Sequence, residues 1–370
     1  MKRKLNVGIV GASANGGWSP VAHIPALKAL ENIELEALCT SRPESAKAAS
    51  EAFGIDRAYY NINDIVRQSD LDIISCVVNI PSHYEVVKAA LENEKHVYCE
   101  WPLGATVEET EELANLANQK GVVSAIGLQG HGSPELLYIK NLVETGWFGQ
   151  IVNIRMALQS KTSLEKASRK AWENEKHRRA TLFSIVGGHT LYYLTHVIGG
   201  ISELSADLST QIKELRLRDT GEKISNEIYD QILIQGKLGD DIPFSTQLTA
   251  IPNKATGWQI EIYGTKGRIV ATSPVMPQIT PIAIQGAKGE DELMTMVAPP
   301  EYLTIEGLPD GPARNVGINY GNMAEAIVNG EEFHPNFQDA LMMHRLLDTI
   351  ELSSEEKRTI KLSTTKNKAN

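Results

Sequence analysis

The glycines of Leu5–Trp18, LNVGIVGASANGGW, are placed where a strand could lead into a phosphate-binding turn. A short apolar run ends at Gly11, and small residues then lead to Gly16 and Gly17, ahead of a helix-compatible stretch. A glycine-rich turn between a strand and a helix lets main-chain N–H groups and the helix N-terminus hold a pyrophosphate. Ser13 stands where G-x-G-x-x-G has its second glycine, so a tight turn without a ligand remains the alternative.

The end of the second predicted strand indicates which nucleotide fits. NAD-binding folds place a carboxylate there to hold the ribose 2′-OH. Here Ile33–Cys39 is followed by Thr40, Ser41, Arg42 and Pro43, with no carboxylate. Ser41 can donate to a phosphate oxygen, and the guanidinium of Arg42 suits phosphate geometry. We therefore predict NADP in preference to NAD, the alternative being that Arg42 only begins the next helix.

These residues need a scaffold that brings strand ends together. Strand and helix signals alternate over residues 1–130, which predicts right-handed crossovers and a doubly wound parallel sheet of the Rossmann type. In such a sheet ligands lie at the carboxyl ends of the strands. The strands are predicted at Leu5–Val10, Ile33–Cys39, Ala58–Tyr60, Asp72–Val78, His96–Cys99 and Val122–Gly127, with helices at Pro43–Phe53, Ile62–Gln68, Ser82–Asn93 and Val107–Lys120.

The pattern changes after this domain. Residues 131–362 are predicted to form an α+β domain with a large, mostly antiparallel open sheet, and residues 363–370 a frayed tail. Pro274–Pro312 is rich in Pro and Gly and indicates a long surface excursion. The predicted strands are Ile151–Leu158, Glu203–Ile212, Ile228–Lys237, Phe244–Ala250, Gln259–Tyr263 and Arg268–Ala271, with helices at Thr190–Val197, Asn322–Asn329 and Asn336–Glu351.

Composition excludes several classes of function. The 370 residues are 42% hydrophobic and 22% charged, as in globular proteins, and the net charge of −10 argues against a nucleic-acid surface. No apolar run is long enough to cross a membrane. Cys39, Cys76 and Cys99 show no metal-ligand spacing, so we expect reduced core thiols in a cytoplasmic protein and no metal. The basic run Lys176–Arg179 is either solvated or recruits an anionic group.

Motifs along most of the chain resemble the glucose–fructose oxidoreductase, inositol dehydrogenase and rhizopine catabolism family. They are GIVGAS, HIPAL (His23–Leu27), His83 after Pro81-Ser82, VYCEWP (Val97–Pro102), Gln129…Pro134, Gly188-His189 and IYGTKG. More narrowly, the turn ending in Gly17-Trp18, SHYEVV (Ser82–Val87), Glu100-Trp101 and LQG (Leu128–Gly130) are similar to the galactose/lactose metabolism regulatory proteins of yeasts.

The resemblance implies a Rossmann domain, an open-sheet domain that often pairs subunits, and a nicotinamide dinucleotide, either NADP or NAD. It therefore implies a homodimer or larger assembly formed through the carboxy-terminal sheet. The residues expected to hold the dinucleotide are Gly11, Ser13, Gly16, Gly17, Trp18, Ser41, Arg42, Asn79, His83, Glu100, Trp101, Pro102 and Gln129.

The acid/base residues depart from the family pattern. Where relatives carry Glu-Lys-Pro, this chain has Glu100-Trp101-Pro102, and an indole cannot exchange a proton near neutral pH. The resemblance implies a cis Trp101–Pro102 bond. It aligns His189 with a family histidine, while the two neighbouring family aspartates are replaced by Ile185 and Tyr192.

We expect His189 to act as acid/base with a pKa near the working pH, with Tyr192 and also His131 as helpers. The alternatives are that His189 is a hydrogen-bonded histidine at a helix start, and that Trp101 is a core residue rather than part of a sugar-stacking wall.

Two functions follow. The first is an oxidoreductase acting with NADP on a sugar or polyol-like small molecule. The second, by resemblance, is a non-catalytic cofactor-sensing regulator with a protein partner, because the yeast proteins bind a transcriptional activator.

Overall fold

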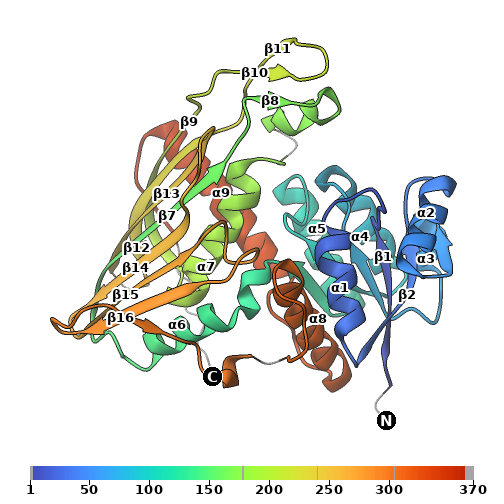
Figure 1. Cartoon of the computed structure of the whole chain (residues 1–370), viewed down its shortest axis with the longest axis horizontal. Coiled ribbons are helices and arrows are strands. Elements are labelled where there is room, and N and C mark those ends of the chain that lie inside the picture. The colour runs from blue at the N-terminus through green and yellow to red at the C-terminus, as the bar shows by residue number, and fades with distance from the viewer. Residues whose placement is uncertain (1–2, 177–178, 240, 304, 363–370) are drawn as a thin grey trace. The chain divides into compact units, whose positions relative to one another are not determined.

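The computed structural model describes residues 3–176, 179–239, 241–303 and 305–362 (Figure 1). The described chain forms two compact units. The first contains the residues up to Gly132 and those from Leu303 to His344; the second contains Ser133–Tyr302 and the residues from Arg345 onward. The expected division at residues 130/131 thus lies close to the first crossing, and the chain also returns to the first unit late in the sequence. The predicted tail, 363–370, lies outside the described residues.

The first unit is built on a parallel sheet with the order β3-β2-β1-β4-β5-β6, which confirms the predicted Rossmann architecture. Its strand β4 is buried at every residue, as the apolar sequence of this strand indicates. The strands are β1 (Leu5–Val10), β2 (Ile33–Cys39), β3 (Arg57–Tyr59), β4 (Ile73–Cys76), β5 (His96–Glu100) and β6 (Ser124–Gly127).

Local signals set the helices of this unit. Gly54 and Gly121 end α2 and α5 in the left-handed conformation, and the Thr106 hydroxyl caps α5 by accepting from the Glu109 N–H. The helical segments are η1 (Ser19–His23), α1 (Ile24–Ala29), α2 (Pro43–Phe53), α3 (Ile62–Val66), η2 (Ile80–Ser82), α4 (His83–Glu92), α5 (Val107–Lys120), η3 (Gln129–Gly132) and α8 (Pro312–Asn329). The long helix α9 (Phe337–Glu356) begins in this unit.

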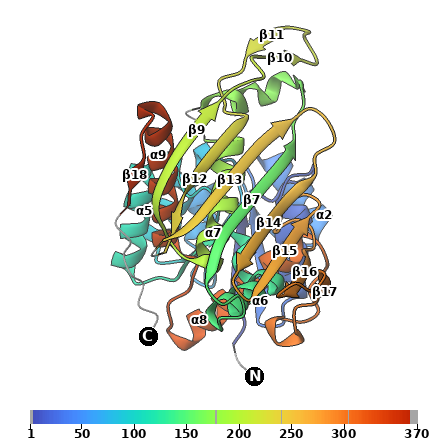
Figure 2. The same ribbon diagram turned by 90° about the vertical axis from the view of Figure 1, so that its left-hand side faces the viewer.

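The second unit contains, among its described residues, a nine-stranded sheet in which only β7 and β13 run parallel. Figure 2 shows one face of this sheet, with α6 and α7 on the opposite side. The strands, in sheet order, are β17 (Met294–Met296), β16 (Ala283–Lys288), β15 (Gly267–Ser273), β14 (Gly257–Gly264), β7 (Ile151–Lys161), β13 (Ile242–Ile251), β12 (Gln231–Leu238), β9 (Ile201–Ser209) and β18 (Ile360–Lys361).

A small second sheet has the order β11-β10-β8. Its strands are β8 (Glu165–Lys166), β10 (Glu214–Leu217) and β11 (Lys223–Ser225), and the remaining helical segments are α6 (Pro134–Glu144), η4 (Ser168–Asn174), η6 (Leu182–Gly187), α7 (Gly188–Ile198) and η7 (Pro300–Tyr302).

The structure corrects the prediction for Pro274–Pro312. This stretch is not only a surface excursion, because β16 and β17 pair antiparallel within it and extend the large sheet. Helix α8 starts at Pro312, ten residues before the predicted Asn322. Among the described residues, none of the helices combines the length and apolar character needed to cross a bilayer.

Candidate coenzyme site

A cleft of about 670 Å³ opens in the first unit at the carboxyl ends of β1, β2 and β4. Strand order reverses between β1 and β4, which is where doubly wound sheets bind ligands. Five of the residues predicted to hold the coenzyme line this cleft: Gly11, Ser13, Ser41, Arg42 and Asn79. The fold therefore brings together side chains from three separate loops of the sequence.

Gly11 shapes the floor of the cleft. Its φ is +102°, and a Cβ at this position would lie 2.3 Å from the carbonyl oxygen of Val77. Its N–H donates to the Cys39 carbonyl at 2.9 Å, and its own carbonyl accepts from the Ser19 hydroxyl at 2.9 Å. Gly16 and Gly17 also have positive φ, with open space around them. This main-chain cradle, which a side chain would fill, fits a pyrophosphate.

Arg42 is the cation of this cleft. Its carbonyl accepts from the hydroxyls of Ser45 at 2.9 Å and Thr40 at 3.2 Å, which fixes the turn after β2. Its exposed guanidinium makes no hydrogen bond or ion pair with the described part of the chain, and no described residue lining the cleft is a carboxylate. The loop after β3 adds polar groups that sequence analysis missed, Asn61 and Asn63; their position after the carboxyl end of a strand was the available signal.

The end of β5 is held by hydrogen bonds. The Glu100 carboxylate accepts from Nε2 of Gln129 at 2.7 and 2.9 Å, and Nε2 of His23 lies 2.9 Å from its Oε1. The Trp101–Pro102 peptide bond is cis, as predicted. Trp101 is only 4% exposed, and its ring centroid lies 4.8 Å from that of His344. Its burial favours the interpretation of Trp101 as a core residue.

Two further residues predicted to hold the coenzyme lie in the scaffold. His83 is fully buried, with Nδ1 2.7 Å from the Pro102 carbonyl and Nε2 3.1 Å from the Val78 carbonyl, and burial lowers the pKa of its ring. Trp18 packs against two apolar clusters of the core, and its buried Nε1 has no partner among the described residues. Neither residue belongs to the wall of the cleft.

The fold also gathers three possible metal ligands that lie far apart in sequence. The ligand atoms of Cys76, His83 and Cys99 are all within 4.8 Å of one another. Both ring nitrogens of His83 already face carbonyl oxygens, and burial raises the pKa of the Cys99 thiol well above its ordinary value. Both features oppose ligation, because a metal needs a free nitrogen lone pair and a thiolate.

His189 and Tyr192 lie three residues apart on α7 in the second unit. His189 is buried, with Nδ1 3.3 Å from the Tyr193 hydroxyl, and desolvation lowers the pKa of its ring to about 3. The expectation of a pKa near neutrality is therefore wrong, because burial disfavours the charged ring and no carboxylate among the described residues offsets that cost. Tyr192 is buried, and its ring lies parallel to that of His196 at 5.6 Å. His131 lies in the first unit, on η3.

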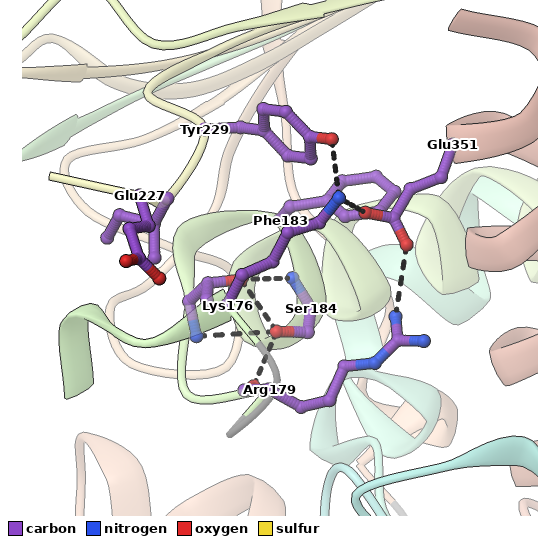
Figure 3. A pocket seen from close by; sticks show the side chains of 9 residues that line it. Lys176, Arg179, Phe183, Ser184, Glu227, Tyr229 and Glu351 are labelled. Atoms are coloured by element: carbon purple, nitrogen blue, oxygen red, sulfur yellow. Dashed lines mark hydrogen bonds and ion pairs between the residues drawn. The ribbon is translucent and has the colours of Figure 1, made fainter. Parts of the chain in front are cut away.

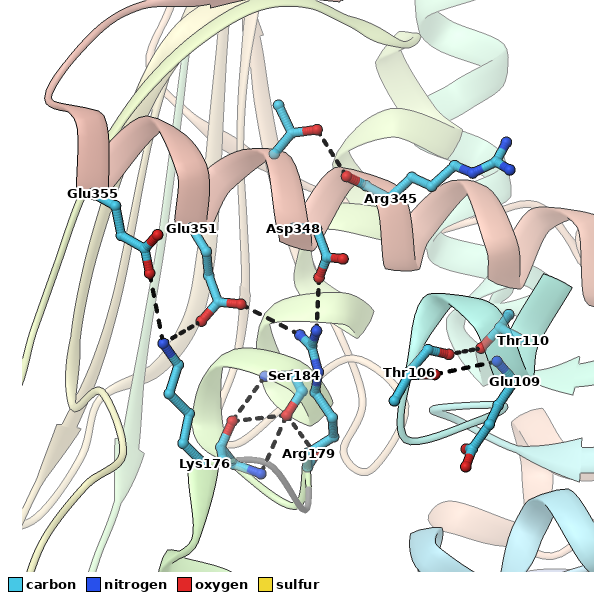
Figure 4. A network of polar contacts seen from close by, with 12 residues as sticks. Thr106, Glu109, Thr110, Lys176, Arg179, Ser184, Arg345, Asp348, Glu351 and Glu355 are labelled. Atoms are coloured by element: carbon cyan, nitrogen blue, oxygen red, sulfur yellow. Dashed lines mark hydrogen bonds and ion pairs between the residues drawn. The ribbon is translucent and has the colours of Figure 1, made fainter.

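A second pocket, of about 420 Å³, lies in the second unit (Figure 3). Lys176 contacts the Tyr229 hydroxyl at 2.7 Å and Glu351 at 3.0 Å; Arg179 contacts Asp348 at 2.7 Å and Glu351 at 3.5 Å (Figure 4). Burial alone would lower the pKa of Lys176, but Tyr229 and Glu351 raise it. These two cations are paired with carboxylates, which argues against recruitment of an anion; positions 177 and 178 lie outside the described residues.

Comparison with known proteins shows which families the two parts of this chain resemble. Residues 5–128 match the oxidoreductase family with an NAD-binding Rossmann fold, and residues 134–273 match the C-terminal domain of Gal80p. The amino-terminal domain of this chain is therefore similar to that oxidoreductase family, in agreement with the predicted Rossmann fold and with a nicotinamide coenzyme.

Individual relatives span nearly the whole chain. Dehydrogenase aclE of Aspergillus oryzae is 26% identical, with 96% of this chain and 97% of that protein aligned. The galactose/lactose metabolism regulatory protein GAL80 of Saccharomyces cerevisiae is 24% identical over 97% of this chain and 94% of its own. The structure of a super-repressor mutant of Gal80p from the same yeast superposes with a TM-score of 0.86 at 24% identity, covering 97% and 98% of the two chains.

Levoglucosan dehydrogenase in complex with NADH and L-sorbose gives a TM-score of 0.85 at 22% identity, covering 98% of this chain and 100% of that one. At these identities the two structural comparisons show the fold. Dehydrogenases and a transcriptional regulator thus share the architecture, so the fold alone does not decide between the two functions.

Proposed function

We propose that the protein is an oxidoreductase that uses a nicotinamide dinucleotide, with NADP preferred, on a CH–OH group of a sugar or polyol-like substrate. The observation that carries this proposal is the cleft of the first unit, with its main-chain cradle at Gly11 and an Arg42 guanidinium that pairs with none of the described residues. No described residue lining the cleft is a carboxylate. Relatives named as sugar or polyol dehydrogenases, such as scyllo-inositol 2-dehydrogenase (NADP(+)) IolW of Bacillus subtilis, 26% identical over 97% of this chain, support the substrate class.

In this proposal different residues of the chain bind different parts of the coenzyme. The N–H groups around Gly11 and Ser13 hold the pyrophosphate, Ser41 and Arg42 hold the 2′-phosphate of the adenosine, and Asn79 holds the adjoining ribose. The other end of the dinucleotide extends along the strand ends toward Glu100 and Gln129. The bound nicotinamide supplies the hydride acceptor or donor.

Arg42→Ala tests the nucleotide preference. Loss of a guanidinium–phosphate contact should weaken NADPH binding about 10- to 100-fold, since a charge-assisted hydrogen bond contributes about 1.5–3 kcal/mol, while NADH binding changes little. Fluorescence titration of both coenzymes measures this. Arg67→Ala, at an exposed arginine outside the cleft, is the matched control and should leave both affinities unchanged. Equal losses for NADPH and NADH in Arg42→Ala would refute the assignment.

A second function is favoured by a specific set of observations. Trp101 stands where related enzymes carry a lysine, and the pKa of His189 is about 3, so both expected acid/base groups are compromised. The match of residues 134–273 to the Gal80p C-terminal domain points to a cofactor-sensing regulator with a protein partner. A panel of sugars and polyols with NADP and NAD, followed by absorbance of the reduced coenzyme, separates the two; coenzyme binding without turnover supports the regulator.

We further propose a cytoplasmic homodimer. The described cysteines are free and buried, as in a reducing compartment. On the large sheet, Leu233 is 46% exposed and lines a groove of about 530 Å³. Apolar residues on an open sheet face are typical of surfaces that bind a second subunit.

A further inference from the structure

A continuous line of hydrogen bonds runs behind the end of β5, entirely within the first unit. It begins at the Glu100 carboxylate and passes to Nε2 of His23 at 2.9 Å. Nδ1 of His23 lies 2.7 Å from the Tyr320 hydroxyl, which lies 2.7 Å from the hydroxyl of Ser75. His23, Tyr320 and Ser75 have no measurable exposure, whereas the Glu100 side chain remains 15% exposed. The line therefore has one open end, at the carboxyl edge of the sheet.

Both nitrogens of His23 and the Tyr320 hydroxyl have hydrogen-bond partners in two protonation states of the ring. With His23 neutral, Nε2–H donates to Glu100, Nδ1 accepts from the Tyr320 hydroxyl, and Tyr320 accepts from Ser75. With His23 protonated, both ring nitrogens donate, and the Tyr320 hydroxyl turns to donate to Ser75. Only hydroxyl rotations separate the two states. One added proton is therefore accommodated without leaving a nitrogen of His23 or the Tyr320 hydroxyl unpaired, which is the usual obstacle to charging a buried histidine.

Three titratable groups face the ring of His23, and only some of them can change charge near neutral pH. They are Tyr98 and Glu100 of β5 and Tyr320 of α8, with the rings of both tyrosines in edge-on contact with the imidazole. Burial raises the pKa of both phenols well above the ordinary value, so they stay neutral at physiological pH. Glu100 is the carboxylate that contacts this ring, at 2.9 Å, and its negative charge would offset a positive charge there.

We propose that Glu100 and His23, backed by Tyr320 and Ser75, store one proton at the carboxyl end of β5. This inference rests on the proposed oxidoreductase function and deepens it. Oxidation of an alcohol releases a proton, and Trp101 cannot take it. In the proposed step the proton enters at the Glu100 carboxylate and leaves His23 protonated on both nitrogens; no other bond is made or broken within the chain. Tyr320 and Ser75 are positioning residues for this store.

The experiment measures protons taken up when coenzyme binds, by calorimetry of the full-length protein in two buffers of different ionisation enthalpy. The oxidised nicotinamide ring is positive and the reduced ring is neutral, so the reduced coenzyme leaves the store better able to hold its proton. We expect greater proton uptake with NADPH than with NADP⁺. In Tyr320→Phe the charged Nδ1–H loses its acceptor, so the proton affinity of the store should fall about tenfold and the difference between coenzymes should shrink.

Tyr98→Phe is the matched control. Tyr98 stacks on Tyr320 with ring centroids 4.3 Å apart, and its buried hydroxyl lies outside the line, so its removal should leave the difference in uptake intact. Ser75→Ala removes the last hydroxyl of the line and should shift proton uptake in the same direction as Tyr320→Phe. The test therefore stays decisive if the Tyr320→Phe protein does not fold.

The two proposals can fail separately. Coenzyme binding with equal proton uptake for NADPH and NADP⁺, or with an undiminished difference in both Tyr320→Phe and Ser75→Ala, overturns the proton store alone. Absence of binding by either coenzyme overturns the proposed function and the store together.

Discussion

An alanine at position 11 would place its Cβ 2.3 Å from the Val77 carbonyl oxygen, at a φ of +102° that side chains rarely adopt. We expect Gly11→Ala to lower the free energy of unfolding by about 2–4 kcal/mol and to abolish NADPH binding, because the turn must move into the cleft. Urea unfolding and fluorescence titration measure both effects. Gly54→Ala, at a helix end with open space and a φ of +69°, should cost about 1 kcal/mol without affecting the coenzyme. Wild-type coenzyme affinity in Gly11→Ala would contradict the cradle.

His189 makes a prediction about acid stability. Its pKa is about 3 in the folded chain and about 6.5 when unfolded, so between these values the unfolded state binds more protons. His189 therefore lowers the free energy of unfolding as pH falls from about 6.5 toward 3, by up to about 1.4 kcal/mol per pH unit. Urea unfolding across this range should show a shallower dependence in His189→Gln.

A contrasting histidine provides the control for this measurement. A hydrogen bond to Asp339 raises the pKa of His334, so His334 contributes stability at low pH that is lost as pH rises through its folded pKa. His334→Gln should therefore steepen the acid loss of stability, the opposite of His189→Gln. Identical pH dependence in wild type and His189→Gln would contradict the assignment of the low pKa.

Residues that line the cleft could be placed from the sequence, whereas residues buried in the scaffold behind it could not. Gly11, Ser41 and Arg42 line the cleft, because local chain geometry at strand ends determines their position. His83 belongs to the scaffold because Pro102, nineteen residues along the chain, supplies a carbonyl to its ring. No local pattern indicates that contact, or the line from His23 to Tyr320, which spans 297 positions.

At the level of elements, the segment that carries Lys176 and Arg179 is tied to α9 mainly by Glu351. This carboxylate is 16% exposed and pairs with both cations, whereas Glu355 is 63% exposed and lies 4.0 Å from Lys176. Glu351→Gln should lower the free energy of unfolding by about 1–3 kcal/mol, since two partly buried cations lose a shared partner. Glu355→Gln should change it by less than about 0.5 kcal/mol. Equal effects in urea unfolding would argue against this role of Glu351.

Elements with strong end signals were predicted well, and those determined by tertiary packing were not. The bounds of α2 and α5 match the prediction because a glycine ends each helix. The first turns of α8 were missed because Gly317 and Gly321 weaken the helical signal. In the structure each glycine leaves room for an apolar side chain, Leu308 and Ile305 respectively, so packing outweighs propensity.

For the whole molecule, the proposed dimer depends on the open face of the large sheet. Strand β12 alternates, with Ile232 and Ile234 buried on one face and Leu233 exposed on the other. If a two-fold axis relates the paired sheets, the interface contains Leu233 of both subunits. One substitution therefore changes the interface twice. Leu233→Asp should therefore weaken the dimer about 100-fold or more, since apolar contact is lost and a carboxylate must be desolvated.

Light scattering at micromolar concentration measures this change directly, as a fall from twice the chain mass to the chain mass. Val328→Asp is the matched control, because Val328 is 51% exposed on α8, which belongs to the first unit, and this change should leave the mass unchanged. A monomeric wild type, or a Leu233→Asp protein that remains dimeric, would remove the sheet face as the subunit contact. A dimer lost in Leu233→Asp with coenzyme binding retained would show that the cleft of the first unit is complete within one chain, because every residue of its wall comes from that unit.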